Sequence, residues 1–169
     1  MIRVMVKCII QLFLYGFMLT CHALPTDRTA LIHLTADTIS LEQQQHHGTY
    51  KGNVMLDQGS THLRADTVIT ENNDRNQLTK AIALGNKTAQ AHVWALTSED
   101  KPELHAYANQ LIYDPLLHRI TLIGNATVTQ GNHSFSAPHI EYDTLTEHVT
   151  TQHEGMQRTT LIVDPKGLS

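Results

Sequence analysis

One eight-residue pattern occurs four times in this chain and constrains its fold more than any other feature. The copies are "LTADTISL" (34–41), "LRADTVIT" (63–70), "AYANQLIY" (106–113) and "FSAPHIEY" (135–142). In each, an apolar residue precedes an alanine by two positions, and another apolar residue follows the alanine by three. The alternation predicts a strand with one buried face, and the extra residue predicts a corner or bulge that keeps the same face inward. Turn-favouring residues occupy that corner, namely Asp37, Asp66, Asn109 and Pro138.

A longer repeat lies between the corners. Blocks 36–64 and 108–136 align without a gap and share Ala, His, Thr, Gly, Asn, Gln and Gly at equivalent positions. They contain "YKGNVMLDQG" (50–59) and "LIGNATVTQG" (122–131), with a partial copy in "ALGNK" (83–87). The segment 65–107 is a stretched version that includes a polar turn at 97–103. Such a period is typical of stacked architectures, in which each unit buries its apolar face against its neighbours.

We therefore predict that residues 30–163 form an all-β domain, an elongated two-sheet jelly roll or solenoid-like stack of antiparallel strands. The four pattern copies would form its corners. A compact sandwich with a fully packed core is the alternative. The sequence leaves the strand register near 85–95 open.

The first 23 residues have the features of an export signal. Arg3 and Lys7 precede an apolar stretch that runs from Cys8 to about Leu19, and small residues suit cleavage after Ala23. This stretch is shorter than the roughly 20 apolar residues of a transmembrane helix. We expect a signal peptide at 1–23, a short leader at 24–29 and a short tail at 164–169. A lipoprotein signal that ends at Cys21 is the alternative.

Removal of residues 1–23 changes the charge and the cysteine content. It takes away two basic residues and both cysteines, which leaves 10 Lys+Arg against 16 Asp+Glu and a formal charge of −6. A negative protein has no electrostatic attraction to nucleic acid, so we expect no nucleic-acid partner.

The sequence offers no catalytic or metal-binding motif. It lacks G-x-S-x-G, H-E-x-x-H and a glycine-rich phosphate loop, so we expect no enzyme, no catalytic residue, no metal and no cofactor. Twelve histidines are present. By strand alternation they fall mostly on the solvent side, and we interpret these as solvated surface residues: His33, His62, His105, His118 and His133.

The same alternation turns a set of apolar residues inward. They either pack on each other or line a cleft for acyl chains: Ile32, Leu34, Ile39, Leu41, Tyr50, Val54, Leu56, Leu63, Val68, Leu111, Tyr113, Leu122, Val128, Phe135, Ile140 and Tyr142.

Two terminal strands have no charge to block an exposed edge, which favours strand addition by a partner. Their residues are Leu31, Ile32, His33 and Leu34 at one end, and Thr159, Thr160, Leu161, Ile162 and Val163 at the other.

Several of these segments together resemble the OstA-like family of periplasmic lipopolysaccharide-transport proteins. The resemblance covers 30–163 and is carried by "LIHLTAD", "GTYKGNVMLDQGSTHLRAD" and "ITLIGNATVTQGNHSFSAPHIEY". It departs at "GNKTAQ" (85–90), where the family has Gly-Asn-Pro.

The resemblance implies a periplasmic β-jelly roll that binds lipopolysaccharide through the acyl chains of its lipid A. It implies an inner-membrane-anchored partner at the N-terminal edge, an outer-membrane translocon at the C-terminal edge, and head-to-tail self-association. It places Ile32 and Leu34 at lipid-contacting positions. Alternatives are the anchored inner-membrane partner of the same system, or an exported structural or metal-binding β-scaffold.

Overall fold

The computed structural model describes residues 30–152 and 158–164 as one large antiparallel sheet that is bent at a corner. The predicted signal peptide, the leader at 24–29 and the tail beyond Asp164 lie outside the described residues. In the described part, no helix is long and apolar enough to cross a membrane.

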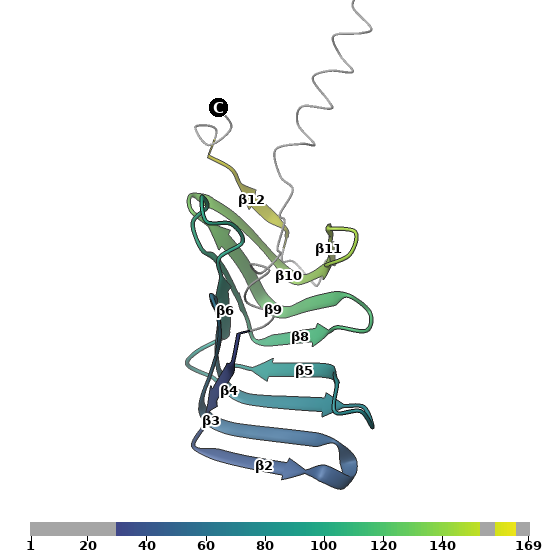
Figure 1. The fold of residues 1–169 in the computed structure, drawn as a ribbon. Coiled ribbons are helices and arrows are strands. Elements are labelled where there is room, and N and C mark those ends of the chain that lie inside the picture. The colour runs from purple at the N-terminus through teal and green to yellow at the C-terminus, as the bar shows by residue number, and fades with distance from the viewer. Residues whose placement is uncertain (1–29, 153–157, 165–169) are drawn as a thin grey trace, which may run out of the picture.

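The sheet has twelve strands, numbered in chain order, and Figure 1 labels most of them. They are β1 (Ile32–Thr35), β2 (Thr38–Glu42), β3 (His47–Gln58), β4 (Thr61–Asn72), β5 (Leu78–Leu84), β6 (Ala91–Ala95), β7 (Leu104–Ala108), β8 (Gln110–Asp114), β9 (Arg119–Gln130), β10 (His133–Asp143), β11 (His148–Gln152) and β12 (Thr160–Ile162). A single 3-10 turn, Gln43–Gln45, links β2 to β3.

The corner divides the sheet into two wings. The first wing has the strand order β2-β3-β4-β5-β8-β9-β10-β11, and Figure 1 shows several of its strands lying one above another as rungs. The second wing has the order β1-β3-β4-β6-β7-β9-β10-β12. The long strands β3, β4, β9 and β10 cross the corner and belong to both wings. The all-β jelly-roll prediction is confirmed, and the two facing sheets are hydrogen-bonded into one.

All four copies of the repeated pattern cross this corner. Copies 63–70 and 135–142 lie within β4 and β10, whereas copies 34–41 and 106–113 join β1 to β2 and β7 to β8. In β3, two residues, Gly52 and Asn53, lie opposite the single corner residue Asp66. A second bulge in β9 sets Gly124 and Asn125 opposite Pro138. An unequal residue count of this kind bends a sheet, so the bulges explain the corner.

The bulge residues have a left-handed backbone, which explains the repeated Gly-Asn. The φ angles are +77° and +48° at Gly52 and Asn53, and +79° and +49° at Gly124 and Asn125. Glycine and asparagine tolerate such angles best. Each glycine carbonyl also accepts a backbone hydrogen bond of 2.9 Å, from the N–H of Asp37 at Gly52 and of Asn109 at Gly124.

Alanines line the inside of the corner. Ala91 pairs with Ala108 and Ala126 with Ala137, and their exposed fractions range from 0 to 5 %. A larger side chain there would push the two wings apart, since the interior is packed to near-crystalline density. The pattern's alanine is therefore explained by the close approach of the wings.

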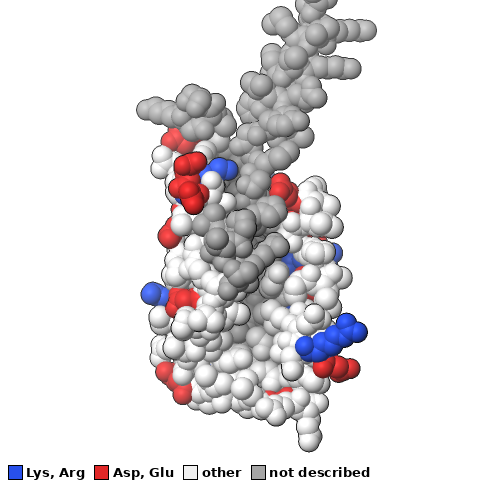
Figure 2. Space-filling view, viewed as in Figure 1, with Lys and Arg blue, Asp and Glu red and all other residues white. Residues whose placement is uncertain are grey.

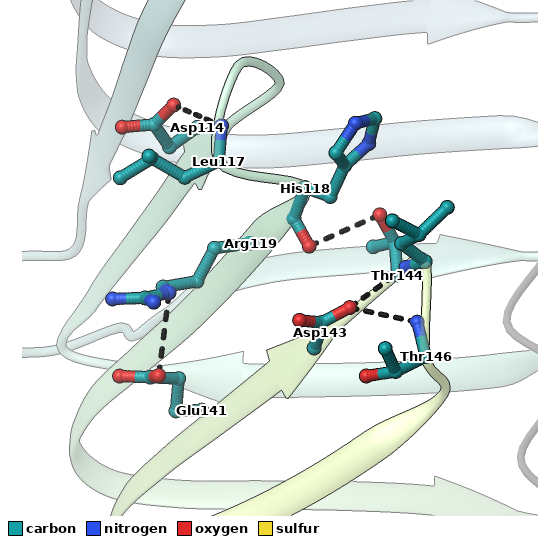
Figure 3. A network of polar contacts seen from close by, with 9 residues as sticks. Asp114, Leu117, His118, Arg119, Glu141, Asp143, Thr144 and Thr146 are labelled. Atoms are coloured by element: carbon teal, nitrogen blue, oxygen red, sulfur yellow. Dashed lines mark hydrogen bonds and ion pairs between the residues drawn. The ribbon is translucent and has the colours of Figure 1, made fainter.

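Two kinds of hydrogen bond stabilise the hairpin tips of the first wing: side chains bond the backbone within a tip, and backbone groups bond each other between adjacent tips (Figure 3). The Asp143 carboxylate accepts hydrogen bonds from the N–H groups of Thr146 and Leu145, which lower the pKa of Asp143. The His118 carbonyl accepts from the N–H of Thr144 at 2.7 Å, and the His46 carbonyl accepts from the N–H of Asn72 at 2.9 Å. These two bonds are equivalent in the repeat, so the repeat preserves contacts as well as residues.

Segment 85–90 forms a loop where a third bulge would lie. The Asn86 side-chain oxygen accepts from the N–H groups of Thr88 and Ala89, each at 2.9 Å, and its amide donates to Asp66 at 3.0 Å. This Asn-centred turn occupies the place of the family's proline-containing segment. It leads into β6, which pairs with β4 and β7 and so settles the register.

We predict that Gly124→Ala destabilises the fold more than Gly131→Ala. Both glycines have left-handed φ, +79° and +57°, so an alanine is strained at either position. A Cβ at Gly124 would also lie 2.6 Å from the side-chain nitrogen of Asn109, whereas at Gly131 the nearest atom is a Pro102 carbon at 3.3 Å. We expect a loss of about 1 kcal/mol for Gly131→Ala and about 3 kcal/mol for Gly124→Ala by urea denaturation. Equal losses would contradict a corner built on close backbone approach.

Candidate functional site

One unbroken apolar row crosses every strand of the second wing. Cross-strand pairing links each residue to the next, and we call the set the inner row: Leu34, Leu56, Leu63, Val93, Ala106, Val128, Phe135 and Leu161. Its members point to the side on which the alanines of the corner are buried. Because side chains alternate along strands, this row runs along the stack rather than along any single strand.

The first wing continues the apolar face in rows of its own. One row pairs Ile39, Tyr50, Val68, Ala83, Leu111, Leu122 and Ile140 in succession. Another brings Tyr113, Ile120, Tyr142 and Val149 together. All predicted inward residues that lie within paired strands share this face, so their orientation is as the alternation indicated.

Burial differs among the predicted residues. Val54, Val68, Leu111, Leu122, Ile140 and Tyr142 are buried, with exposed fractions of 1 to 8 %. The half-buried ones are Leu34, Tyr50, Leu56, Leu63, Val128 and Phe135. The first group packs in the core of the chain itself, whereas most of the second group belongs to the inner row and leaves apolar surface accessible.

Four of the predicted residues are exposed rather than enclosed. Ile32, Ile39 and Leu41 have exposed fractions of 61, 49 and 62 % because they lie on β1 and β2, the end strands, beyond which no described strand pairs. Tyr113, on β8 in the middle of the sheet, is 42 % exposed because its paired residue on β5 is the small Ala81. Alternation along a strand predicts which face of the sheet a side chain lies on. Whether that side chain is buried depends on the side chains that adjacent strands place beside it.

The two predicted edge strands are indeed terminal. Within residues 30–152 and 158–164, β1 pairs with β3 alone and β12 with β10 alone. Apolar residues in these strands and next to them are exposed, as Leu31, Leu161, Ile162 and Val163 show with fractions of 80, 53, 56 and 39 %. The ends of the first wing, β2 and β11, are terminal too, which the sequence analysis did not predict.

The opposite face of the second wing has an aromatic ladder that the sequence analysis missed. Neighbouring strands β4, β6 and β7 contribute its stacked rings, and we call the set the outer aromatic ladder: His62, His92, Trp94, His105 and Tyr107. Ring centroids are 4.1 Å apart for His92 and Tyr107 and 4.5 Å for His92 and Trp94. The Arg64 guanidinium lies 5.4 Å from the Trp94 ring centroid. The only signal in the sequence was an aromatic or histidine at successive outward positions of "HVW" and "LHAY".

Our interpretation of the histidines as solvated residues was therefore too simple. His62 and His105 do lie on the outer face, but their side chains are only 30 and 32 % exposed. His62 is also bonded to Asp57. Ring stacking contributes about 0.5–1.5 kcal/mol per pair, so these histidines help to join β4, β6 and β7. Partial burial, then the neighbouring His105 and Arg64 charges, lower the pKa of His92 to about 4.

A hollow of about 260 Å³ lies at the corner between β9 and β10. Its lining is mixed and includes polar residues, among them Asn125, Thr127, Ser136 and Arg158. The corner alanines Ala126 and Ala137 line it as well, but no residue of the inner row does.

These features define a class of protein: an open-ended, bent antiparallel stack whose inner face has one unbroken apolar row from β1 to β12. The chain belongs to the family described as LptA/(LptD N-terminal domain) LPS transport protein, whose model matches residues 33–148. Its role is accordingly in the transport of lipopolysaccharide (LPS). The family is one of transport proteins, so the expectation that the chain is not an enzyme is confirmed.

Individual relatives agree with this assignment. The chain is 31 % identical over 122 residues to the lipopolysaccharide export system protein LptH of Pseudomonas aeruginosa, a match to 72 % of this chain and 68 % of that protein. It is 25 % identical over 146 residues to Escherichia coli K12 LptA, covering 86 % of this chain and 77 % of that one. The crystal structure of P. aeruginosa LptH, a periplasmic component of its transport device, superposes with a TM-score of 0.72 at 26 % identity, over 83 % of this chain and all of that one.

Acidification should destabilise the outer aromatic ladder through His92. The pKa of His92 falls from 6.5 to about 4 on folding, so between these values the unfolded chain binds more protons. The folded state therefore has its full free energy of unfolding above pH 6.5 and loses part of it as the pH falls towards 4. The group contributes at most about 1.4 kcal/mol per pH unit, and solvent screening lowers this slope.

Urea denaturation between pH 7.5 and 4 measures the effect. We expect His92→Asn to flatten the decline in the free energy of unfolding, while His33→Asn, at an exposed position of β1, leaves it unchanged. Identical slopes for the wild type and His92→Asn would contradict the assignment.

Proposed function

We propose that the chain carries LPS across the periplasm by holding the acyl chains of lipid A against its apolar inner face. In this proposal it is one unit of a bridge between inner-membrane and outer-membrane export complexes. A signal peptide at 1–23 would direct its export, and cleavage after Ala23 would release it in that compartment. The description of LptH as a periplasmic component supports this location.

The inner row is the observation that carries this proposal. It crosses eight strands without a polar residue and runs parallel to the stack. At about 4.8 Å between strands, its length is about 34 Å. Most of its residues are half-buried, so they can gain contacts with a ligand, whereas the buried residues of the first wing already pack on each other.

The energetics favour a series of equivalent sites. Burial of a 12-carbon acyl chain contributes on the order of 9 kcal/mol, at ~0.8 kcal/mol per methylene. A single optimal site would release such a ligand slowly. A row whose members are alike from strand to strand lets the acyl chain move by small steps of similar free energy. The sequence has no glycine-rich phosphate loop, so we infer that the work of transport comes from another component.

The ends of the stack suit continuation by further units. The stack is about 34 Å long, close to the ~30 Å thickness of a single hydrocarbon core, and in this proposal a path between two membranes uses several units in series. Exposed apolar residues gather on the terminal strands, with Ile32, Ile39 and Leu41 at one end and Leu161 and Ile162 at the other. Strand addition there would extend the inner row across the junction.

We assign the two ends to different partners. The β1–β2 end would pair with the inner-membrane-anchored component, and the β11–β12 end with the outer-membrane translocon or with the next copy, head to tail. On the face shown in Figure 2, most of the described surface is uncharged, and the charged side chains form small groups towards its margins.

Single photo-crosslinking residues, placed in separate variants on either face of the second wing, test the lipid path. Leu34 and Val128 belong to the inner row, while His33 and Thr129 are their neighbours on the opposite face. We expect LPS adducts in cells at Leu34 and Val128 and little at His33 and Thr129. Equal adducts on both faces, or none at the inner positions of an exported and folded protein, would overturn the proposal.

Charge at a terminal strand should disrupt assembly. Leu161, 53 % exposed, continues the inner row on β12, whereas Leu116, 66 % exposed, lies on the hairpin tip between β8 and β9, away from both ends of the stack. We expect Leu161→Asp to weaken self-association at least tenfold by light scattering across a concentration series, because strand addition would bury an unpaired carboxylate. Leu116→Asp is the matched control and should associate as the wild type does. If both variants associate normally, β12 is not the junction.

A further inference from the structure

Two imidazoles of the outer aromatic ladder are in contact through one ring nitrogen of each. His92 on β6 and His105 on β7 are diagonal neighbours, and the Nε2 atom of His92 lies 3.1 Å from the Nδ1 atom of His105. Each strand is fixed on its other side, β6 by β4 and β7 by β9. The pair is therefore held by the sheet, and the ring stacking of His92 on Trp94 and Tyr107 restricts its rotation.

The separation matches two nitrogen ligands of one metal ion. First-row metals such as Zn²⁺ bind histidine nitrogen at about 2.0–2.1 Å, so two such bonds with nitrogens 3.1 Å apart enclose an angle of about 98°. This value lies between the 90° of octahedral or square-planar neighbours and the ~109° of tetrahedral ones. A metal ion in place of the hydrogen-bonded proton therefore requires little change in the distance between the two nitrogens.

Glu103 lies on the side of His105 where metal-binding histidines usually have a carboxylate, although at ion-pair rather than hydrogen-bond distance. Its Oε2 atom lies 3.6 Å from Nε2 of His105, the nitrogen that faces away from His92. A carboxylate at that side favours the tautomer with the proton on Nε2, which leaves the lone pair of Nδ1 directed at the shared position. His92 completes the pair when its proton moves from Nε2 to Nδ1, so binding requires no net loss of a proton.

We propose that His92 and His105 form a binding site for a late first-row divalent cation, such as Cu²⁺, Ni²⁺ or Zn²⁺, on the outer face of the second wing. No metal site was expected from the sequence, because the two histidines are thirteen positions apart and meet only through the pairing of β6 with β7. Among the described residues, no group of three or more potential ligands surrounds a common point. Water, or a group from another molecule, would complete the coordination.

Arg64 makes a second, independent test of the assignment. Its positive charge lies close enough to lower the pKa of His92, and it would repel a bound cation by the same field. Its guanidinium lies over the Trp94 ring and is not a ligand. Removal of this charge should therefore tighten metal binding, whereas removal of an ordinary surface cation should not.

The single tryptophan of the chain reports on the site. Trp94 stacks on His92 with ring centroids 4.5 Å apart, so a Cu²⁺ ion held by His92 would quench its fluorescence. We expect saturable quenching by Cu²⁺ in the folded full chain, weaker binding of Ni²⁺, and a rise in Tm with Zn²⁺, in line with the Irving–Williams order.

Matched variants decide the outcome. His92→Gln and His105→Asn keep an amide near the ligand nitrogen, and each should raise the half-quenching Cu²⁺ concentration at least about tenfold and abolish the Tm rise. Glu103→Ala should weaken binding about tenfold, and Arg64→Gln should strengthen it several-fold. His62→Asn is the control, because His62 also stacks on Trp94 but is bonded to Asp57.

Unchanged half-quenching in His92→Gln and His105→Asn would overturn the proposal, as would a loss in His62→Asn equal to theirs. A cooperative thermal transition and an unchanged far-UV circular dichroism spectrum without metal show, for each variant, that the fold is intact. The measurement uses no lipid, so its result is independent of the proposed transport function.

Discussion

The bend of the sheet depends on one constraint, the close approach of two backbones at the corner. The carbonyls of Gly52 and Gly124 accept hydrogen bonds from the N–H groups of Asp37 and Asn109, and a Cβ at either glycine would collide with the side chain of that same residue. Each glycine is followed by an asparagine that shares its left-handed conformation. Two residues opposite one bend the strand pair while the same face stays inward. Without this device the apolar rows of the two wings would lie on one flat sheet and would not enclose an interior.

The bend separates two faces with different chemistry. Inside, the alanines at the corner allow the wings to meet, and the rows beyond them are large and apolar. Most of the inner row remains half-buried, which suits a surface that must contact a ligand. In the first wing, most residues of the row that runs from Ile39 to Ile140 are buried in the core. Outside, the rings of His62, Trp94 and His105 stack across three strands. The outer ladder strengthens the second wing at β6 and β7, the only short strands in its middle.

Much of this could be predicted from the sequence because the information is local. A period of two identifies the inward face, and a displaced alanine marks the corner. A gapless repeat, whose copies are 72 positions apart, relates β3 to β9 and β4 to β10. Even the left-handed φ of His46 and His118, 52° in both, follows the repeat. What alternation could not predict was enclosure. Ile39 and Tyr113 face inward, yet they are 49 and 42 % exposed, because burial depends on what another strand places beside them.

The sequence by itself determined the repeating corner, the inward and outward faces and the unblocked terminal strands, since each depends on residues close together in the chain. Only the tertiary structure decided which strands are neighbours. That choice joined the two predicted sheets into one, made β2 and β11 terminal as well, and settled the register of β6. It also brought His92 within 3.1 Å of His105, because pairing distances across a sheet are set by hydrogen bonds between strands and leave no periodic trace along either strand.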